Sequence, residues 1–501
     1  MTANRADGPR CVIIGAGISG ILMGIKLRER GWTDFVILEK TDDLGGTWRD
    51  NIYPGVACDV AAHLYVYSFA PNPRWRSRYA KGADIWKYYR DVAERYKILP
   101  HIRYGQDVTR AAFDGRQWQV ETADGGFFVA DVVVSAVGRL HQPVLPGIPG
   151  KDSFAGTSCH SARWDASLDP AGKRVGLIGS GSSGTQIITA LAGKVAALRV
   201  FQRTAQWVFP IEDTPVPWWR RLACHFSPAY ANRYYRLLRD QTEMRARVTT
   251  GDPVARAARD QLCLDKLGTI RDEALRARLT PDYEVGCKRL VMSWNYYEAI
   301  QQPGVEVISD AIDHIAPRGV VTKDGTLHEL DVLVFATGFD AHAFLRPMQV
   351  SGQDGISLDQ VWQDLPLCYQ SIAIPHMPNF FLINGPYSPG GSASVVGIVE
   401  EQVGYIMQLI GLVAENDVLI APREEAARAW LDEVRTRANA TVWASGGCTS
   451  WYLDASGTPA LDPATLSELH ARLAAVNRDD YIIAPRGQAR QEHAMPVLES
   501  A

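Results

Sequence analysis

The first apolar segment of the chain is short and ends at a glycine-rich turn. Cys11–Ile14 is uniformly apolar and runs into the turn at 15–20, whose sequence is GAGISG. Apolar residues then recur with helical spacing to about Gly31, and a second apolar run, Phe35–Leu38, is followed by Glu39. Short apolar runs bounded by turns are typical of buried strands, and a longer periodic segment is typical of a helix. The pattern predicts a strand–helix–strand unit with parallel strands.

The same plan recurs in the middle of the chain. Arg174–Ile178 leads into a second turn at 179–184, with the sequence GSGSSG, and a periodic segment follows. The next apolar run is Leu198–Gln202, and Arg203 comes directly after it. Two such units predict an α/β fold with two Rossmann-like dinucleotide-binding domains.

Strand patterning is absent between Pro210 and about Val285. This stretch is polar and rich in arginine, and several prolines interrupt it. Helix-favouring composition with proline breakers predicts a helical insertion. Its part 218–247 interleaves aromatic residues with arginines, which suits either a membrane-surface helix or, as we prefer, a packed cap over an apolar substrate.

Strand patterning returns after the insertion. The runs Val305–Ser309, 320–321 and Asp331–Phe335 are predicted strands. The last run ends at the sequence ATG of 336–338, much as 131–137 ends at a glycine. We predict that these two strand ends pair as hinges.

Composition places the chain among ordinary globular proteins. It has 501 residues, of which 46% are hydrophobic and 22% charged, and its net charge is −4. This length predicts two or three domains, and the small charge argues against nucleic acid or an anionic membrane as partner. Because no run of about 18 apolar residues occurs and the start of the chain carries no apolar leader, we expect a cytoplasmic protein without integral membrane association.

The cysteines and the C-terminal tail carry no recognisable pattern. Eight cysteines are scattered singly, without a Cys-x-x-Cys pair or a zinc-like spacing. We therefore expect isolated reduced thiols and no metal site. The tail after about Pro485 is polar and aperiodic, so we assign it no function.

The glycine-rich turns have a shared chemical purpose. The first glycine of such a turn permits tight geometry, the second lets the backbone approach a pyrophosphate, and the third lets helix and strand pack closely. The helix N-terminus then faces the phosphates. Because each turn follows a strand and opens a helix, we expect both to bind dinucleotides.

The residue after the second strand distinguishes the two ligands. Glu39 can accept hydrogen bonds from a ribose diol, whereas Arg203 and Thr204 suit a phosphate dianion. A solvated surface arginine is the alternative interpretation of Arg203. The economical assignment is FAD in the first unit and NADPH in the second.

Four further stretches carry a resemblance to a known family. The first is residues 154–165, which match the pattern Phe-x-Gly-x-x-x-His-x-x-x-Trp-Pro/Asp at Phe154, Gly156, His160, Trp164 and Asp165. The others are the Gly-Gly-Thr-Trp of 45–48 with the Tyr-Pro-Gly of 53–55 and Asp59, the Cys-Lys-Arg of 287–289, and the Ala-Thr-Gly-Phe-Asp of 336–340. Together they cover roughly residues 10 to 455, and the chain resembles the type I Baeyer–Villiger monooxygenases.

The resemblance implies a reaction and the residues that carry it. The family's cofactors are FAD and NADPH, and its substrates are O2 and a small-molecule ketone. A flavin peroxide converts the ketone into an ester or lactone. Arg289 resembles the active-site arginine and Asp59 the residue that orients it. Lys288 resembles the lysine of the 2′-phosphate site, and Trp451 a tryptophan near the nicotinamide. The plain alternatives are a loop carboxylate for Asp59, a solvated lysine and a core tryptophan.

The remaining assignments complete the predicted site. His160 is more often structural than catalytic on such a linker, so we interpret it as a conformational residue. The predicted cofactor-binding residues are Gly15, Gly17, Ser19, Gly20, Glu39, Gly46, Thr47, Trp48, Asp59, Tyr65, Val108, Gly179, Ser180, Gly181, Ser182, Ser183, Gly184, Gln186, Arg203, Thr204, Lys288 and Trp451. The predicted domains are an FAD-binding domain of 1–142 and 336–501, an NADP-binding domain of 143–210 and 286–335, and the insertion 211–285.

The resemblance weakens in two places, and three other functions compete with it. Ala61 and Ala62 are smaller than expected beside the flavin, and the sequence after Asp454 departs from the family pattern. One rival is a flavin monooxygenase that oxygenates sulfur or nitrogen centres. Another is an NADPH-dependent disulfide or quinone reductase, whose disulfide form requires a redox Cys pair that the sequence does not indicate. The third is a non-catalytic flavin-binding sensor.

Overall fold

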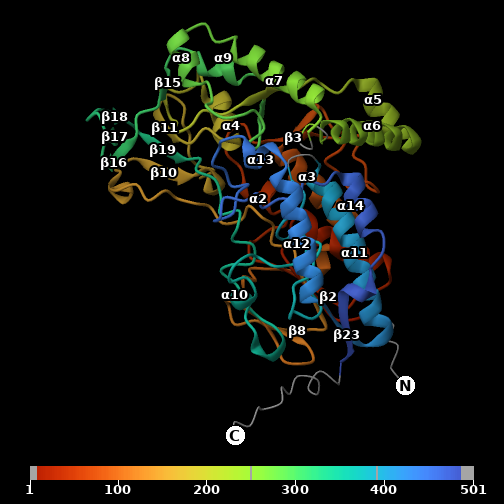
Figure 1. The fold of residues 1–501 in the computed structure, drawn as a ribbon. Coiled ribbons are helices and arrows are strands. Elements are labelled where there is room, and N and C mark those ends of the chain that lie inside the picture. The colour runs from red at the N-terminus through yellow and green to blue at the C-terminus, as the bar shows by residue number, and fades with distance from the viewer. Residues whose placement is uncertain (1–7, 247, 249–250, 391–392, 487–501) are drawn as a thin grey trace.

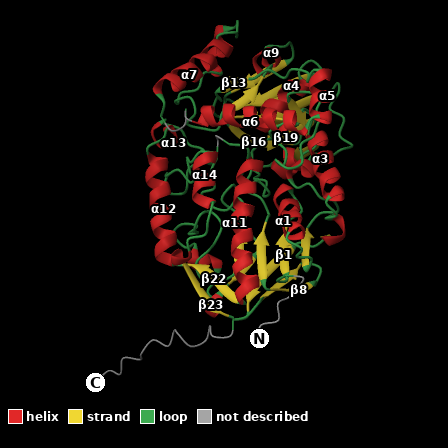
Figure 2. Cartoon of the chain, turned by 90° about the vertical axis from the view of Figure 1, so that its right-hand side faces the viewer, coloured by secondary structure: helices red, strands yellow, loops and turns green. Residues whose placement is uncertain are grey.

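The computed structural model describes residues 8–246, 248, 251–390 and 393–486. The polar tail, for which no function is predicted, lies outside these residues from 487 onward. Two parallel sheets organise the described chain, one in the lower half and one in the upper half of Figures 1 and 2.

The first sheet has the strand order β21-β9-β1-β2-β5, and all its pairings are parallel. Its strands are β1 (Cys11–Ile14), β2 (Phe35–Glu39), β5 (Ile102–Tyr104), β9 (Val132–Ser135) and β21 (Phe380–Leu382). Every residue of β1 and β9 is buried, as expected for apolar runs covered on both faces. The predicted first unit therefore forms the centre of this sheet.

The second sheet repeats this arrangement with the order β10-β19-β11-β12-β15, again parallel throughout. Its strands are β10 (Thr157–His160), β11 (Arg174–Ile178), β12 (Ala197–Phe201), β15 (Val305–Ile308) and β19 (Val332–Phe335). The strand predicted at Leu198–Gln202 is therefore displaced by one residue. The α/β fold with two dinucleotide-type sheets is confirmed.

Smaller sheets and helices surround these two. The small sheets comprise β3 (Ala57–Ala61) with β4 (Tyr79–Lys81); β20 (Gln349–Ser351), β6 (Val108–Phe113), β7 (Trp118–Thr122) and β8 (Phe127–Ala130); β13 (Val208–Pro210) with β14 (Val291–Ser293); β16 (Ile312–Ala316), β17 (Gly319–Thr322) and β18 (Leu327–Glu329); and β22 (Val418–Pro422) with β23 (Tyr481–Pro485). The helices outside the insertion are α1 (Ile18–Glu29), α2 (Thr47–Asp50), α3 (Gly82–Arg95), α4 (Ser182–Leu191), α9 (Tyr296–Ile300), α10 (Leu358–Val361), α11 (Val395–Asn416), α12 (Glu424–Asn439), α13 (Val442–Ser445) and α14 (Leu466–Leu473).

The stretch predicted as an insertion is helical and lies along the upper edge of the molecule (Figure 1). It contains α5 (Trp218–Phe226), α6 (Pro228–Ala246), α7 (Pro253–Leu267) and α8 (Glu273–Arg278). Proline is the first residue of α6 and of α7, where its missing N–H has no intrahelical role. The predicted breakers therefore mark helix starts.

The two predicted strand ends lie against each other. Pro143 and Phe339 form an antiparallel bridge, and the N–H of Val144 donates to the carbonyl of Gly338 at 3.0 Å. The segments that leave β9 and β19 are therefore paired where the chain passes between the two sheets, and their role as hinges stays a prediction.

Helix α11 bears on the expectation that the protein has no membrane-spanning helix. Among the described residues it alone is long and apolar enough to cross a membrane by length and composition. It is a core helix here, because Ile406, Leu409 and Ile410 are fully buried.

The cysteine prediction is wrong for one pair. Cys287 and Cys448 form a disulfide with their Cα atoms 6.1 Å apart, although 161 positions separate them in sequence. The N–H of Glu284 donates to the carbonyl of Gly446 at 2.9 Å, so the two segments pack together in the folded chain. Such a contact leaves no local spacing pattern, which is why single-sequence reasoning missed it. The other six cysteines are free.

Candidate active site

An ion pair joins two residues that are far apart in the sequence. The Nη2 of Arg289 donates to the Oδ2 of Asp59 at 2.6 Å, across a sequence separation of 230 residues. Asp59 lies on β3, and Arg289 lies in the turn before β14. The charge of Asp59 raises the pKa of Arg289 above its usual value. The guanidinium is therefore a permanent cation held in a fixed direction.

The side chain of Tyr452 completes this cluster, and sequence reasoning did not single it out. Tyr452 is 2% exposed. Burial raises its pKa, and the nearby guanidinium groups of Arg289 and Arg139 oppose the rise. Trp451 is 38% exposed, and its ring centroid lies 4.6 Å from that of Tyr452. The predicted tryptophan is therefore at the surface edge of the cluster and not in the core.

The first glycine turn faces the Gly-Gly-Thr-Trp loop. A Cβ on Gly15 would lie 2.7 Å from the carbonyl oxygen of Ala136, and one on Gly46 would lie 3.2 Å from the Cα of Gly17. Gly17 caps α1 without any side-chain hydrogen bond, so the first N–H groups of α1 are unpaired by side chains. A narrow, glycine-lined backbone next to a helix N-terminus fits a pyrophosphate.

Glu39 supports the same interpretation of this site. Its side chain is 5% exposed, and its Oε2 accepts from the N–H of Ala16 at 2.8 Å, within the glycine turn. Its Oε1 accepts from the N–H and the hydroxyl of Thr41. The carboxylate is thus held beside the turn, where the ribose of a dinucleotide lies in such folds. The residues present fit FAD.

The other residues predicted around the flavin lie on neighbouring elements. Trp48 follows Thr47, the first residue of α2, and its Nε1 donates to the hydroxyl of Tyr65 at 3.2 Å. Tyr65 is buried, and burial raises its pKa. Val108 begins β6, and Gln106, two residues earlier, donates its N–H to the carbonyl of Glu39 at 2.9 Å. Ser19 and Gly20 lie in the first turn of α1.

The second glycine turn has the same geometry. A Cβ on Gly179 would lie 2.4 Å from the carbonyl oxygen of Ala336, and one on Gly184 would lie 2.2 Å from the carbonyl oxygen of Gly179. At Gly181, the N-cap of α4, a Cβ would meet open space, and no side chain caps the helix. Ser180, Ser182 and Ser183 complete the turn and the start of α4. This open helix N-terminus can receive a second pyrophosphate.

Gln186 connects the second turn to the element that carries Asp59. Its Nε2 donates to the carbonyl of Ala57 on β3 at 2.9 Å, and its Oε1 accepts from the hydroxyl of Tyr53 at 2.9 Å. A Cβ on Gly55 would lie 2.5 Å from the carbonyl oxygen of Gln186. The Tyr-Pro-Gly loop therefore positions the two nucleotide sites and the ion pair relative to one another.

Two cations meet beyond the second turn. Burial lowers the pKa of Lys288, and the charge of nearby Arg203 lowers it further. Arg203 forms no ion pair with a carboxylate of the described chain, and Thr204 is its neighbour in the loop after β12. Two mutually repelling cations beside a hydroxyl fit a phosphate dianion, as NADPH carries on its adenosine ribose.

The fingerprint residues lie in and around β10, an edge strand of the second sheet. His160 ends β10, is 6% exposed, and accepts from the N–H of Ala162 through Nδ1 at 3.1 Å. Burial lowers its pKa. Trp164 is buried in the core of this half, and Asp165 accepts from the N–H of Ser167 at 2.8 Å. A Cβ on Gly156 would lie 2.5 Å from the carbonyl oxygen of Asp331 and would clash with the ring of Phe154.

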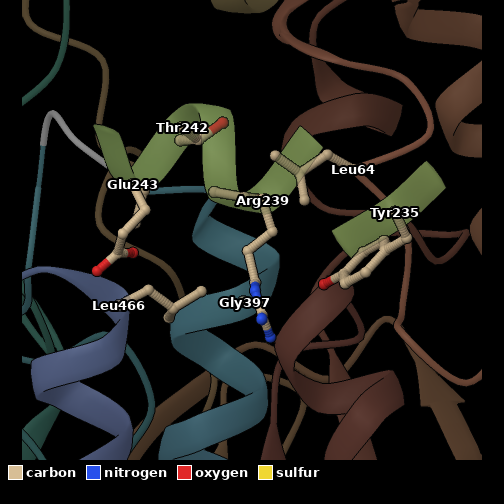
Figure 3. A pocket seen from close by; sticks show the side chains of 9 residues that line it. Leu64, Tyr235, Arg239, Thr242, Glu243, Gly397 and Leu466 are labelled. Carbon is tan, nitrogen blue, oxygen red and sulfur yellow. The ribbon is translucent and has the colours of Figure 1, made fainter. Parts of the chain in front are cut away.

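The helices of the insertion pack against two different parts of the molecule. Helix α6 lies against the C-terminal helices α11 and α14, whereas α7 packs against β13 in the core that also holds Cys287. Figure 3 shows a recess where Tyr235 and Arg239 of α6 face Gly397 of α11 and Leu466 of α14. The recess is not the site of the ion pair. Among the described residues, no group of three or more His, Cys, Asp or Glu is arranged to hold a metal ion.

Comparison with known proteins defines the class. Residues 12–221 match the family described as pyridine nucleotide-disulphide oxidoreductase. An uncharacterized monooxygenase of Mycobacterium tuberculosis is 43% identical over 477 residues, covering 94% of this chain and 96% of that protein. A Baeyer–Villiger monooxygenase of Streptomyces coelicolor is 39% identical, covering 94% and 92% respectively. The chain is thus a flavin monooxygenase.

A solved structure agrees over nearly the whole length. The cyclohexanone monooxygenase of Rhodococcus sp. Phi1, bound to NADP+, superposes with a TM-score of 0.86 at 30% identity and covers 95% of this chain and 99% of that chain. This chain belongs to the type I Baeyer–Villiger monooxygenases, the family of FAD- and NADPH-dependent enzymes that its motifs predict. The sequence argument against a disulfide reductase was the lack of a Cys pair, and the Cys287–Cys448 disulfide removes that argument. Membership of the monooxygenase family excludes this rival instead.

Proposed function

We propose that this enzyme inserts one oxygen atom of O2 into a small-molecule ketone and so forms an ester or a lactone. The observation that carries the proposal is the Arg289–Asp59 ion pair, assembled beside Tyr452 from distant parts of the chain. A fixed cation next to two nucleotide-type turns is what a reaction through a negatively charged oxygen requires.

The two turns divide the cofactors between them. Gly15, Gly17 and Gly20 with the N-terminus of α1 would hold the pyrophosphate of FAD, and Glu39 its ribose. Gly46, Thr47, Trp48, Tyr65 and Val108 would line the rest of that site. The second turn would hold NADPH, with Arg203, Thr204 and Lys288 on the 2′-phosphate and Gln186 supporting the approach of the two sites.

When bound, the flavin supplies electron transfer from NADPH and the activation of O2. The protein's own contribution is electrostatic. Arg289 would stabilise the negative charge that develops on the oxygen of the substrate carbonyl, because its own charge is permanent and already oriented. Asp59 acts through Arg289 by holding the direction of the guanidinium.

The surrounding segments close and align the site. Trp451 and Tyr452 would border the substrate side and limit the access of water. The fingerprint residues Phe154, Gly156, His160, Trp164 and Asp165 would act as a linker that sets the relation between the two domains, because they join β10 to β19 and to the core of the second sheet. We also propose the cytoplasm as the location of the enzyme. The apolar helix α11 is a core helix of the fold, because its Ile406, Leu409 and Ile410 are fully buried.

The decisive experiment identifies products. Purified enzyme with FAD and NADPH is incubated with linear, cyclic and aryl ketones, and products are analysed by mass spectrometry under 18O-labelled oxygen. We expect an ester or lactone that carries one labelled oxygen atom. Formation of sulfoxides or N-oxides while every ketone stays unchanged contradicts the proposal and favours the rival monooxygenase.

A further inference from the structure

Arg139 is a buried cation that pairs with no carboxylate of the described residues. It follows Gly138 at the end of the segment that leaves β9 and is 9% exposed. Among the described residues, the arginines buried to this extent are Arg139, Arg259 and Arg486. Arg259 pairs with Asp260 at 2.6 Å, and Arg486 pairs with Asp131 and Asp417. Only Arg139 of these forms no ion pair within the described chain.

The hydrogen-bonding capacity of Arg139 is also largely unused. A guanidinium has five N–H donors. Here Nη2 reaches the carbonyl oxygen of Ala460 at 3.4 Å, and Nε is buried without any partner. A buried charge that lacks a counter-ion and makes few hydrogen bonds is costly in free energy. Such a group is expected to obtain its partner from a ligand.

The groups around Arg139 are aromatic or neutral. Its guanidinium carbon lies 5.5 Å from the ring centroid of Phe344 and 5.7 Å from that of Trp451. The titratable groups that act on it are Tyr452, Tyr387 and Cys368, which stay neutral near pH 7 because burial raises the pKa of each. Burial lowers the pKa of Arg139 itself to about 10, so its charge persists at neutral pH.

Arg139 has two residues of the proposed reaction centre, Trp451 and Tyr452, as neighbours. Tyr452 is close enough to both Arg139 and Arg289 for each charge to act on its pKa. Trp451 and Leu140, which flank Arg139 in space and in sequence, are 38% and 41% exposed. A ligand that enters beside these apolar side chains can therefore meet Arg139 while its carbonyl group faces Arg289.

We propose that Arg139 binds a carboxylate of the substrate, so that this enzyme acts on keto acids. The inference rests on the proposed oxygen insertion into ketones and narrows its substrate class. A carboxylate suits the site because a guanidinium pairs with it through two parallel hydrogen bonds. The flanking aromatic rings would hold the apolar part of the acid.

Binding tests Arg139 independently of turnover. The FAD-loaded enzyme is titrated with cyclohexanecarboxylate and with cyclohexanecarboxamide, which is neutral and of similar shape, and tryptophan fluorescence and flavin absorbance are followed. We expect the carboxylate to bind on the order of 100-fold more tightly than the amide, as for removal of one partner of a buried charge pair. Arg139→Met should bring the two dissociation constants close together, and Arg139→Lys should restore part of the preference.

A matched control removes a surface charge nearby. Arg346 is an exposed arginine that pairs with Asp359 at 2.7 Å, so Arg346→Met changes the net charge by the same amount. This variant should keep the wild-type preference. Equal binding of acid and amide by the wild type, or an unchanged preference in Arg139→Met, overturns the inference. The inference is also overturned if Arg139→Met alters the flavin spectrum while the ratio of the carboxylate and amide dissociation constants stays constant. The charge of Arg139 then acts on the flavin and not on a substrate carboxylate.

Turnover separates this inference from the proposed function. A cyclic keto acid and its methyl ester are compared as substrates. We expect kcat/KM to favour the acid by on the order of 100-fold in the wild type and to lose that preference in Arg139→Met. If neither ketone gains an oxygen atom, the proposed reaction is contradicted. The ratio of carboxylate to amide binding still tests whether Arg139 binds a carboxylate.

Discussion

Arg289 and Arg139 both act on Tyr452, yet their charges are compensated in opposite ways. Arg289 is paired with Asp59 at 2.6 Å although its side chain is 41% exposed. Arg139 is far more buried and has no carboxylate in the described chain. A compensated cation is ready in the free enzyme, whereas an uncompensated one awaits an anion. The difference separates a group suited to the reaction from a group suited to recognition.

The largest expected effect comes from removing the compensated cation. Arg289→Ala should lower the rate of oxygen insertion by at least ~100-fold, the usual cost of losing one electrostatic stabiliser of an oxyanion. Reduction of bound FAD by NADPH should remain measurable in stopped-flow absorbance. Near-normal ester formation by this variant would falsify the assigned role and place the reaction's cation elsewhere.

The next largest effect should follow when Arg289 loses its carboxylate partner and so becomes an uncompensated cation like Arg139. Asp59→Asn keeps the shape of the side chain but removes the compensating charge. Loss of such a supporting residue typically costs about 10- to 100-fold, which we expect in kcat, with KM for the ketone changing less. Asp59→Glu should recover part of the rate. A fall in FAD content or in thermal stability without any change in kcat contradicts the orienting role.

Arg203 and Lys288, the two cations near the second turn, extend the comparison to an anion of known identity, the 2′-phosphate of NADPH. Arg203→Gln removes one of the two charges proposed to bind the 2′-phosphate. Hydrogen bonds to charged groups contribute about 1.5–3 kcal/mol, so KM for NADPH should rise on the order of 10- to 100-fold. The KM for NADH, which lacks that phosphate, should stay nearly constant. An equal change in KM for both coenzymes would show that Arg203 does not bind the phosphate.

Glu400, a half-buried acid, provides the same comparison for a group of opposite charge and has the smallest expected effect. Burial raises the pKa of Glu400 to about 7, despite hydrogen bonds from Ser68 at 2.8 and 3.0 Å. The folded protein therefore holds this proton more tightly than the unfolded chain does. The stability linked to the proton is complete below the unfolded pKa of about 4.5 and is lost as the pH rises through about 7.

The measurement for Glu400 is thermal unfolding from pH 5 to 8. Relative to Glu400→Gln, which cannot ionise, the wild type should lose on the order of 2 kcal/mol of unfolding free energy over this range. Parallel pH profiles for the two proteins contradict the assignment. The recess in Figure 3, formed by α6 against α11, should not contribute to the difference in unfolding free energy, because the wild type and Glu400→Gln share its lining residues.

The fold was largely predictable because its signals are local. The bounds of β1 and β11 agree with the apolar runs 11–14 and 174–178, and the positions of Gly15 and Gly179 follow from the tight turns that only glycine permits. The Arg289–Asp59 pair was predicted through family motifs, and the structure brings the two side chains together. Their roles stay predictions until the variants are measured.

The contributions of Tyr452, Arg139 and the Cys287–Cys448 disulfide were not predictable in this way. Each depends on a contact between segments that are far apart in the chain, and neither spacing nor periodicity encodes such a contact. The sequence around Arg139, which includes Gly138, Leu140 and His141, neither marks this arginine as buried nor indicates whether a carboxylate would lie opposite it.

The sequence by itself determined the two strand–turn–helix units, their order, and the kind of nucleotide that each turn suits, because these depend on backbone geometry and on residues a few positions apart. Only the tertiary structure decided which charges are compensated. Burial and pairing are properties of the assembled chain, so the same arginine side chain becomes an oriented cation beside Asp59 and an unpaired one between Phe344 and Trp451.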